Sequence, residues 1–314
     1  MRTSAPRVSV VMPVYNAAPY LAQAVESVLD QSFKNFEFLI HDDGSSDASW
    51  RILVSYAERD PRISVSRSEN RGIPATVNFL MGRVRGDLIA RMDADDICPL
   101  DRFAIQVHRF DEDPCLSVLG GSALLVDEGD RPIMIHTPPL SHSDIDDLNM
   151  RGVVAIQQSA VMMRHSDFLR AGGYNDNFPV AEDHDLWLRM AEIGKLQNLP
   201  DVLIKYRIHN KSISGRKRDL QRDMCLQACQ EAWARRGVSA PFEYSDWRMD
   251  DTRASRLKFY LRYAWQAWSS GYRPTWRHYA LKAVRLAPAS LDAWKCLIFG
   301  ALRKPESSRK SDFG

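Results

Sequence analysis

The sequence lacks the features that mark a membrane-embedded or disulfide-linked protein. Its longest nearly apolar run, residues 116–126, is far shorter than the roughly 20 residues that span a bilayer. The first residues contain no apolar stretch typical of a signal peptide. The five cysteines include no CxxC pair, which favours reduced, buried thiols over disulfides or zinc ligands. These absences predict a cytoplasmic globular protein.

The net charge of +2 conceals a strong asymmetry along the chain. Residues 1–204 carry a net charge of −11 and residues 205–314 a net charge of +13. Six of the eight tryptophans also lie in the basic part, interleaved with Arg and Lys as in interfacial helices. We therefore predict peripheral contact of this part with an anionic membrane, the alternative being that its aromatic residues only pack its helices together. No nucleic-acid-binding signature is present, so nucleic acid is not an expected partner.

The first half of the chain alternates strand and helix patterns. β-Branched or apolar runs at residues 8–12, 36–40, 63–65 and 87–92 are separated by segments with helical spacing. This alternation predicts an α/β fold with a doubly wound, mainly parallel sheet, in which ligands bind at the carboxyl ends of the strands.

From about residue 216 the pattern becomes purely helical. Helices are expected at residues 219–236, 252–270, 275–287 and 291–303. We therefore predict a first domain over residues 1–214, a helical, basic and aromatic region over 215–303, and a disordered tail over 304–314.

Three acidic clusters occupy positions suited to chemistry. Asp42 and Asp43 end one strand, and Asp93-Ala94-Asp95-Asp96 follow another, where carboxylates could hold a divalent cation against phosphate oxygens. Glu182 and Asp183 begin a helix, where a carboxylate could accept a proton from a hydroxyl group. Each cluster also has a purely structural interpretation: an Asx-turn with Asp47 as the cap of the next helix, a turn before a helix near Asp101, and acidic residues that favour a helix N-terminus.

A further segment, Tyr206-Arg207-Ile208-His209, offers a phosphate-binding arginine and a metal-binding imidazole. The alternative for His209 is a histidine packed in a loop. Neither interpretation is settled by this segment alone.

Six motifs in order then resemble the family 2 glycosyltransferases, over about residues 7–214. They are VSVVMPVYN (8–16), DDGSSD (42–47), DADDI (93–97), GGY (172–174), EDHDLWLR (182–189) and YRIHNKSIS (206–214). The resemblance implies a GT-A-type fold with a C-terminal all-helical extension, an inverting mechanism and a Mg²⁺ or Mn²⁺ cofactor. One departure is Gln157-Gln158, where relatives often carry a histidine, which concerns the acceptor side.

The resemblance also implies roles for individual residues. The metal would be held by Asp93 and Asp95 with His209 as a further candidate, and Asp183 would be the general base. The nucleotide-sugar would contact Pro13, Tyr15, Asp43, Arg71, Arg91, Asp93, Asp96 and Arg207. On the acceptor side we expect Glu182 and Trp187, the latter with a role in the helix core as an equal alternative.

The implied function is transfer of a hexosyl or N-acetylhexosaminyl group from a UDP- or dTDP-sugar to a saccharide or lipid-linked acceptor hydroxyl. The setting would be cell-surface polysaccharide or glycolipid synthesis at the inner face of the plasma membrane. Two alternatives stay open. A nucleotidyltransferase would be expected to show a Gly-rich, Lys-containing loop where this chain has Pro13-Val14-Tyr15-Asn16, and an inactive sugar-nucleotide-binding scaffold would not need the intact Asp95 and Asp183.

Overall fold

The structure is a computed structural model that describes residues 5–209, 218–244 and 252–303. The described chain forms two compact units. The first contains residues 5–123, 137–206 and 218–244, and the second contains residues 124–136, 207–209 and 252–303. The units do not divide at residue 214 as expected, because residues 218–244 belong to the first unit and a hairpin at 124–136 to the second. The expected disordered tail at 304–314 lies outside the described residues.

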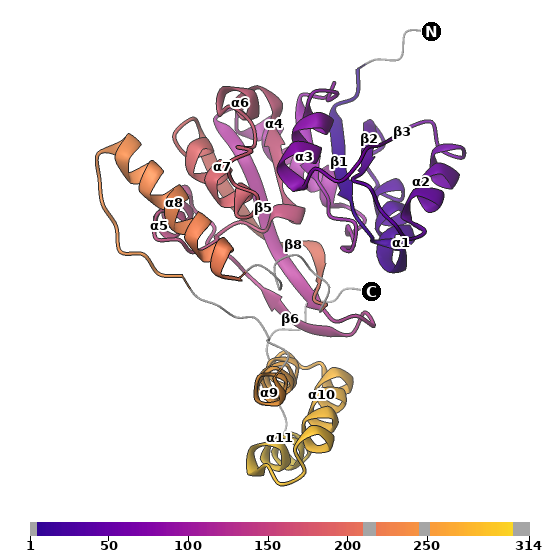
Figure 1. Ribbon diagram of the computed structural model, residues 1–314, viewed down its shortest axis with the longest axis vertical. Helices are drawn as coiled ribbons and strands as arrows, with labels where there is room; N and C mark the ends of the chain where they lie inside the picture. Colours follow the sequence, from indigo (N-terminus) through magenta and orange to yellow (C-terminus); the bar gives the residue numbers. More distant parts are fainter. Residues whose placement is uncertain (1–4, 210–217, 245–251, 304–314) are drawn as a thin grey trace. The chain divides into compact units, whose positions relative to one another are not determined.

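A mixed sheet forms the centre of the first unit (Figure 1). Its strand order is β3-β2-β1-β4-β7-β5, with β8 paired to β5. The first four strands in the chain are parallel, while β7 is antiparallel to β4 and to β5. The strands are β1 (Val8–Val14), β2 (Phe36–Asp42), β3 (Ile63–Arg67), β4 (Leu88–Arg91), β5 (Leu116–Val126), β7 (Met162–Arg164) and β8 (Lys195–Arg207). The prediction of an α/β fold with a mainly parallel sheet is thus confirmed.

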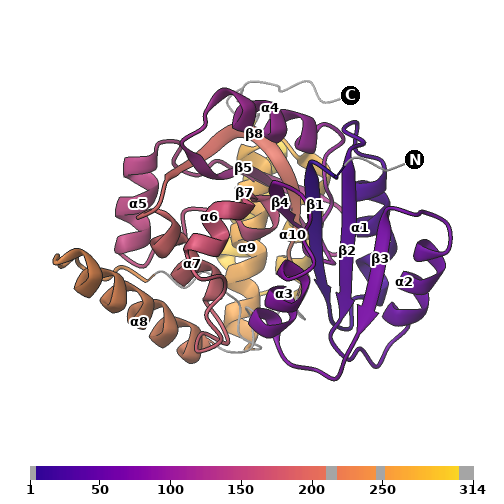
Figure 2. The same ribbon diagram turned by 90° about the horizontal axis from the view of Figure 1, so that it is seen from above.

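Helices cover both faces of this sheet, which explains why β1 and β2 are buried along almost their whole length (Figure 2). The helices of the first unit are α1 (Ala18–Leu29), α2 (Ser49–Ala57), α3 (Ile73–Met81), α4 (Arg102–Glu112), α5 (His142–Met150), α6 (His165–Arg170), α7 (Glu182–Met190) and α8 (Arg218–Arg236), with a short 3₁₀ turn, η1 (Gln158–Ala160). Around β1–β3, α3 lies on one face and α1 and α2 lie on the other. On the α3 side, Val77, Phe168 and Trp187 pack with sheet residues such as Val11 and Met163 in one buried cluster.

Two local expectations differ from the structure. Strand β1 continues through Pro13 to Val14, although Pro13 was expected to end it. Pro13 lies beyond Val11, the last residue of β1 paired with β4, so a missing N–H is tolerated there. Helix α2 begins after Ala48, and Asp47 lies one residue earlier, where it accepts a hydrogen bond from the Ser49 N–H (2.9 Å).

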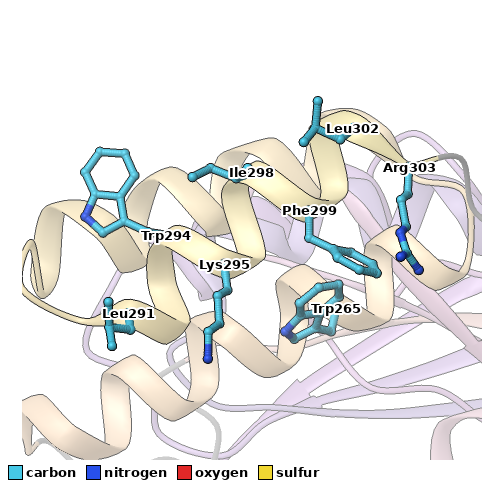
Figure 3. Close-up of a pocket in the computed structure, with 8 residues that line it drawn as sticks. All are labelled: Trp265, Leu291, Trp294, Lys295, Ile298, Phe299, Leu302 and Arg303. Carbon is cyan, nitrogen blue, oxygen red and sulfur yellow. The ribbon is translucent and has the colours of Figure 1, made fainter.

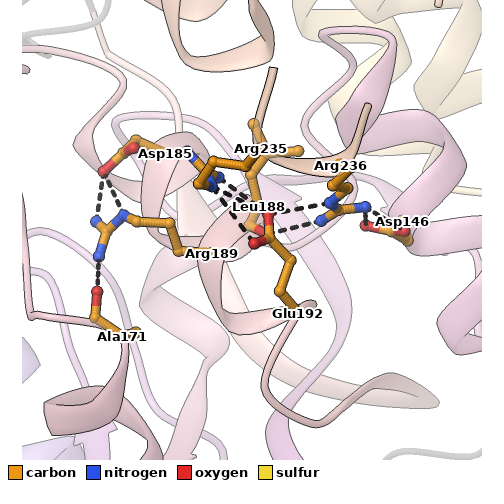
Figure 4. Close-up of polar contacts among 8 residues, drawn as sticks. All are labelled: Asp146, Ala171, Asp185, Leu188, Arg189, Glu192, Arg235 and Arg236. Carbon is orange, nitrogen blue, oxygen red and sulfur yellow. Dashed lines mark hydrogen bonds and ion pairs between the residues drawn. The ribbon is translucent and has the colours of Figure 1, made fainter. Parts of the chain in front are cut away.

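Helix α8 packs against α7 and α5 within the first unit (Figure 4). Its residue Cys229 is fully buried, with its Sγ 3.5 Å from the His184 Nε2 atom of α7 and 3.5 Å from the Asn149 carbonyl oxygen of α5. Arg236 pairs with Asp146 (2.7 Å) and Glu192 (3.0 Å), and donates to the Leu188 carbonyl oxygen (2.7 Å). Helical periodicity alone could not show that this helix returns to the sheet domain.

Replacing Arg236 by alanine should lower the free energy of unfolding of the first unit by about 2 kcal/mol, because the Leu188 carbonyl and the Asp146 carboxylate lose their charged donor and Glu192 loses one of two. Arg235→Ala is the matched control. Arg235 pairs only with Glu192, near the surface, so its removal should cost about 0–1 kcal/mol. Urea denaturation of both variants measures the difference. Equal losses would mean that Arg236 does not hold α8 in place.

The second unit combines a β-hairpin with three helices. The hairpin contains the end of β5 and β6 (Pro132–His136), and the helices are α9 (Arg253–Ser269), α10 (Arg273–Leu286) and α11 (Leu291–Leu302). Tyr263, Trp276 and Tyr279 form its aromatic core, and the Tyr279 hydroxyl donates to the Asp127 carboxylate (3.0 Å). Part of the aromatic content therefore packs the helices together, as the alternative interpretation expected.

The described residues contain no helix that is both long enough and apolar enough to cross a bilayer. All five cysteines are free thiols, and four of them are buried. Cys115 is exposed, contrary to the expectation of buried thiols, because it lies in the turn directly before β5.

Candidate functional site

Strand order brings the motif-bearing loops to one edge of the sheet. β1 lies between β2 and β4, and all three are parallel, so their carboxyl ends lie at the same edge. From β1 the sheet is extended first on one side, by β2 and β3, and then on the other side, by β4. The edge beside β1 is therefore a topological switch point, where open α/β sheets bind ligands. The loops after Val14, Asp42 and Arg91 meet there.

The loops after β1 and β2 are joined by Asn16. Its side-chain oxygen accepts hydrogen bonds from the N–H groups of Ser46 (2.8 Å) and Asp47 (3.3 Å), and its own N–H donates to the Ser45 hydroxyl (2.9 Å). Asn16 adopts a positive φ of 51°, a conformation that asparagine tolerates better than most residues. The loop is thereby fixed, and the neighbouring Tyr15 is half exposed at the edge of the site.

Asp43 holds the loop after β3 against the loop after β2. Its buried carboxylate accepts hydrogen bonds from the N–H groups of Arg71 (2.7 Å) and Gly72 (3.0 Å). Gly72 has a φ of 86°, which requires glycine, and a side chain on Gly44 would approach the Asn70 nitrogen to 2.8 Å. Between the loops after β2 and β3 lies a depression of about 510 Å³, which is lined by Gly44, Arg67, Ser68, Glu69 and Asn70. The Arg71 side chain is exposed beside it.

The acidic segment after β4 contains both buried and accessible carboxylates. Asp93 forms an ion pair with the buried Arg91 (2.9 Å). Burial raises the pKa of Asp93, and the charge of Asp95 adds to this effect against the lowering effect of Arg91. Asp96 is buried, whereas Asp93 and Asp95 are partly exposed. Arg91 thus positions Asp93 from inside the protein.

Helix α7 places Glu182 and Asp183 in its first turn, next to this acidic segment. Burial raises the pKa of Asp183 to about 6, and the negative charge of Asp93 contributes to the rise. Burial also raises the pKa of Glu182 to about 8, together with the charge of Asp183. The preceding Ala181 adopts a left-handed conformation (φ 59°), a strained geometry for a residue with a side chain. The motifs at 93–97 and 182–189, almost 90 residues apart, therefore meet in one electrostatic site.

Tyr174 is a component of the site to which the sequence analysis gave no role. It is buried, interacts electrostatically with Arg91 and Glu182, and accepts a hydrogen bond from the Gln158 side chain (3.3 Å). Asn78 fixes it through hydrogen bonds to the Tyr174 carbonyl and N–H groups (2.8 and 3.1 Å). Two signals in the sequence pointed to Tyr174: it belongs to the GGY motif, and its hydrogen-bond partner Gln158 is part of the departure from the family pattern.

The carboxylates present fit a hard divalent cation, although the protein alone does not complete a metal site. Within the parts of the chain that the structure describes, no three His, Cys, Asp or Glu side chains are grouped to hold a metal ion. Asp93 and Asp95 supply oxygen ligands of the type preferred by Mg²⁺ or Mn²⁺. The pKa values of Asp93, Glu182 and Asp183 are raised first by burial and further by neighbouring carboxylate charge, and a cation would neutralise that charge. The remaining ligands would come from a bound diphosphate and water.

Three of the predicted site residues have other surroundings. Trp187 is fully buried in the core of the first unit, so it cannot form the floor of an acceptor site; its helix turns it toward the sheet. Arg207 belongs to the second unit, where it is buried and paired with Asp130 (2.5 Å) of the hairpin. His209 also belongs to the second unit, and its metal-binding role stays a prediction.

The raised pKa of Asp183 makes a prediction about stability. Because the folded-state pKa of about 6 exceeds the ordinary 3.8, the charged form opposes folding, and stability falls as pH rises between these values. In metal-free buffer, Asp183→Asn should therefore be more stable than wild type at pH 8, by about 2–3 kcal/mol. The gain should shrink below pH 6 and vanish near pH 4.

Denaturation at several pH values tests this, with Asp201→Asn on the exposed surface of β8 as the control. A pH-independent effect of Asp183→Asn would show that the carboxyl is not held in an unfavourable charged state.

Together, the loops at the switch point, the accessible carboxylates after β4 and the carboxyl pair on α7 define a site suited to binding a phosphate-bearing ligand and to accepting a proton. The family model described as glycosyl transferase family 2 matches residues 9–170, and a related model, glycosyltransferase like family 2, matches residues 133–233. The chain belongs to glycosyl transferase family 2, and it is a glycosyltransferase.

Individual proteins agree with this assignment. The Bacillus subtilis protein named as glycosyltransferase EpsE is 33% identical over 236 residues, covering 72% of this chain and 83% of EpsE. The amylovoran biosynthesis glycosyltransferase AmsE of Erwinia amylovora is 29% identical over 213 residues, covering 67% of this chain and 79% of AmsE.

Among solved structures, the mannosyltransferase PcManGT from Pyrobaculum calidifontis, in complex with GDP-Man and Mn²⁺, superposes with a TM-score of 0.54 at 18% identity. The match covers 96% of this chain and 81% of that chain. This likeness supports the GT-A fold.

Proposed function

We propose that the chain is a metal-dependent, inverting glycosyltransferase that uses a nucleoside-diphosphate sugar. The proposal is carried by the placement of Asp93, after β4, and Asp183, at the start of α7, close enough for the charge of Asp93 to contribute to the raised pKa of Asp183. It puts a carboxylate suited to a cation–diphosphate complex beside one suited to proton removal. Burial raises the pKa of both carboxyl groups, Glu182 further than Asp183, so Asp183 ionises first and is the better candidate for the base.

In this mechanism Asp183 removes the proton from the acceptor hydroxyl as its oxygen attacks the anomeric carbon. The bond from that carbon to the phosphate oxygen breaks on the opposite face, and the nucleoside diphosphate leaves. A single displacement inverts the anomeric centre without a covalent intermediate, so one base suffices. When bound by Asp93 and Asp95, Mg²⁺ or Mn²⁺ would neutralise charge on the leaving diphosphate. His209 is retained as a further candidate ligand.

The remaining assignments concern the donor and its surroundings. We assign the nucleoside to the loops at the switch point, in contact with Pro13, Tyr15 and Asp43. Arg71 would reach the diphosphate from the exposed rim, and Asp96 would lie near the sugar. Arg91 would act by holding Asp93 in place, since it is buried. Arg207 could contact a phosphate only by giving up its ion pair with Asp130 for one with the ligand.

A UDP- or dTDP-sugar donor is favoured, because each Asp43 carboxylate oxygen accepts one backbone hydrogen bond and retains a lone pair for a pyrimidine imide N–H. AmsE, a relative named for amylovoran biosynthesis, supports a role in cell-surface polysaccharide synthesis. The acceptor would then be a growing saccharide or a lipid-linked saccharide, used on the cytoplasmic side of the membrane.

The deciding experiment incubates the full chain with a panel of UDP-, dTDP- and GDP-sugars, with Mn²⁺, Mg²⁺ or a chelator. Release of nucleoside diphosphate from one donor, dependent on metal, is expected, and NMR of the transfer product should show an inverted anomeric configuration. No release with any donor would favour the inactive sugar-nucleotide-binding scaffold, and a retained configuration would exclude the single displacement.

A further inference from the structure

Helix α11 carries an apolar stripe that the second unit leaves exposed. Leu291, Trp294, Ile298 and Leu302 recur at helical spacing, with 74, 44, 53 and 80% of their surfaces exposed. Figure 3 shows Trp294, Ile298 and Leu302 along the same edge of α11. Large apolar side chains that are exposed together, rather than singly, mark an interaction surface.

The stripe borders a groove of about 720 Å³ between α9 and α11. The rings of Trp265, on α9, and Phe299, on α11, meet edge to face at 5.5 Å and form its apolar lining. Lys295 and Arg303 supply its cationic groups, and the Arg303 guanidinium lies 4.4 Å from the Phe299 ring centre. We call Leu291, Trp294, Ile298 and Leu302 the α11 face.

The charge around this face specifies the kind of partner. Residues 252–303 contain ten Lys and Arg but a single acidic residue, Asp292. Exposed bases occur on all three helices, among them Lys258 on α9, Arg285 on α10 and Lys295 on α11. A second copy of the same face would bring like charges together, which opposes self-association. Apolar side chains surrounded by bases, with tryptophan among them, instead match the boundary between anionic headgroups and acyl chains.

We propose that the α11 face docks on an anionic lipid bilayer, with Trp294, Ile298 and Leu302 entering the headgroup–acyl boundary and the surrounding bases contacting lipid phosphates. The proposal assigns the membrane contact to one helix face of the second unit rather than to the basic part as a whole. It does not depend on sugar transfer, and it would hold for an inactive protein of the same structure.

The test is flotation of the full chain with vesicles of pure phosphatidylcholine or of phosphatidylcholine mixed with phosphatidylglycerol, at low and high salt. Wild type should bind only the anionic vesicles, and this binding should weaken as the salt concentration increases. The triple variant Trp294→Ser, Ile298→Ser, Leu302→Ser should bind at least tenfold more weakly. Leu169→Ser, which removes an exposed leucine (62%) from α6 in the first unit, is the matched control and should bind like wild type.

Additional measurements locate the contact. Acyl chains brominated near the headgroup should quench tryptophan fluorescence of wild type more than that of Trp294→Phe. A chain ending at residue 303 should bind like wild type; loss of binding on this deletion would place the contact in residues 304–314 and overturn the proposal. Thermal melts and transfer to a water-soluble acceptor should be unchanged in the triple variant, which separates a docking defect from unfolding or a failed catalytic assignment.

The proposal is overturned if wild type ignores anionic vesicles at low salt, or if the triple variant binds them as wild type does. It is also overturned if light scattering shows a wild-type dimer that the triple variant converts to a monomer without any change in vesicle binding. That result would make the α11 face a contact between two copies of the chain.

Discussion

Replacing Asp183 by asparagine is expected to lower kcat by 10²–10⁴-fold, about 3–5 kcal/mol of transition-state free energy. The amide occupies the same volume but cannot accept the acceptor's proton. Because Asp183 lies at the start of α7 and not in the loops that enclose Asp43, the affinity for the nucleoside diphosphate should stay nearly unchanged. Steady-state transfer rates and calorimetric titration with the nucleotide measure the two quantities.

Two controls make this result specific. The asparagine variant should be at least as stable as wild type at pH 8, so lost turnover cannot be attributed to unfolding. Asp185→Asn serves as the neighbouring control, because Asp185 is ion-paired with Arg189 in the same helix. This variant should lower the free energy of unfolding but leave kcat close to the wild-type value. Transfer by Asp183→Asn at the wild-type rate would remove Asp183 from the mechanism.

The second large effect is expected for Asp95→Ala. Removing this carboxylate should weaken Mn²⁺-dependent binding of the nucleoside diphosphate by tenfold or more, because the cation links the protein to the phosphates. Binding in the presence of a chelator should change little, since contacts to the nucleoside remain. Calorimetry of wild type and variant, with and without Mn²⁺, separates these contributions.

Asp101→Ala provides the comparison for Asp95→Ala. Asp101 is an exposed acidic residue just before α4, in the same stretch of chain, and makes no side-chain capping hydrogen bond there. It should leave nucleotide binding unaltered with or without Mn²⁺. If wild type itself binds the nucleoside diphosphate equally well in Mn²⁺ and in chelator, the carboxylates after β4 form a turn and no metal site.

Local chemistry was sufficient to predict much of the first unit. A buried parallel strand needs a largely apolar run, and the runs at 8–12 and 36–40, each interrupted by one polar residue, form β1 and β2. The parallel order then requires that Asp43 and Asp93 follow strands at a common edge of the sheet. The meeting of Asp183 with Asp93 could be proposed only through the six motifs, because nothing in their separate stretches of sequence specifies that contact.

Other features were decided by tertiary packing. Trp187 and Arg91 have sequence neighbours typical of a site, yet their side chains point into the core, and only the fold determines which face of a helix or strand is buried. Arg207 is buried against a hairpin far away in the sequence, and α8 belongs with the first unit because Cys229 and Arg236 find partners on α5 and α7. The same holds for the C-terminal aromatics, whose composition predicted either packing or membrane contact. Packing buries Trp276 and leaves Trp294 exposed, because a helix of fixed periodicity can turn only one stripe of side chains toward its neighbours.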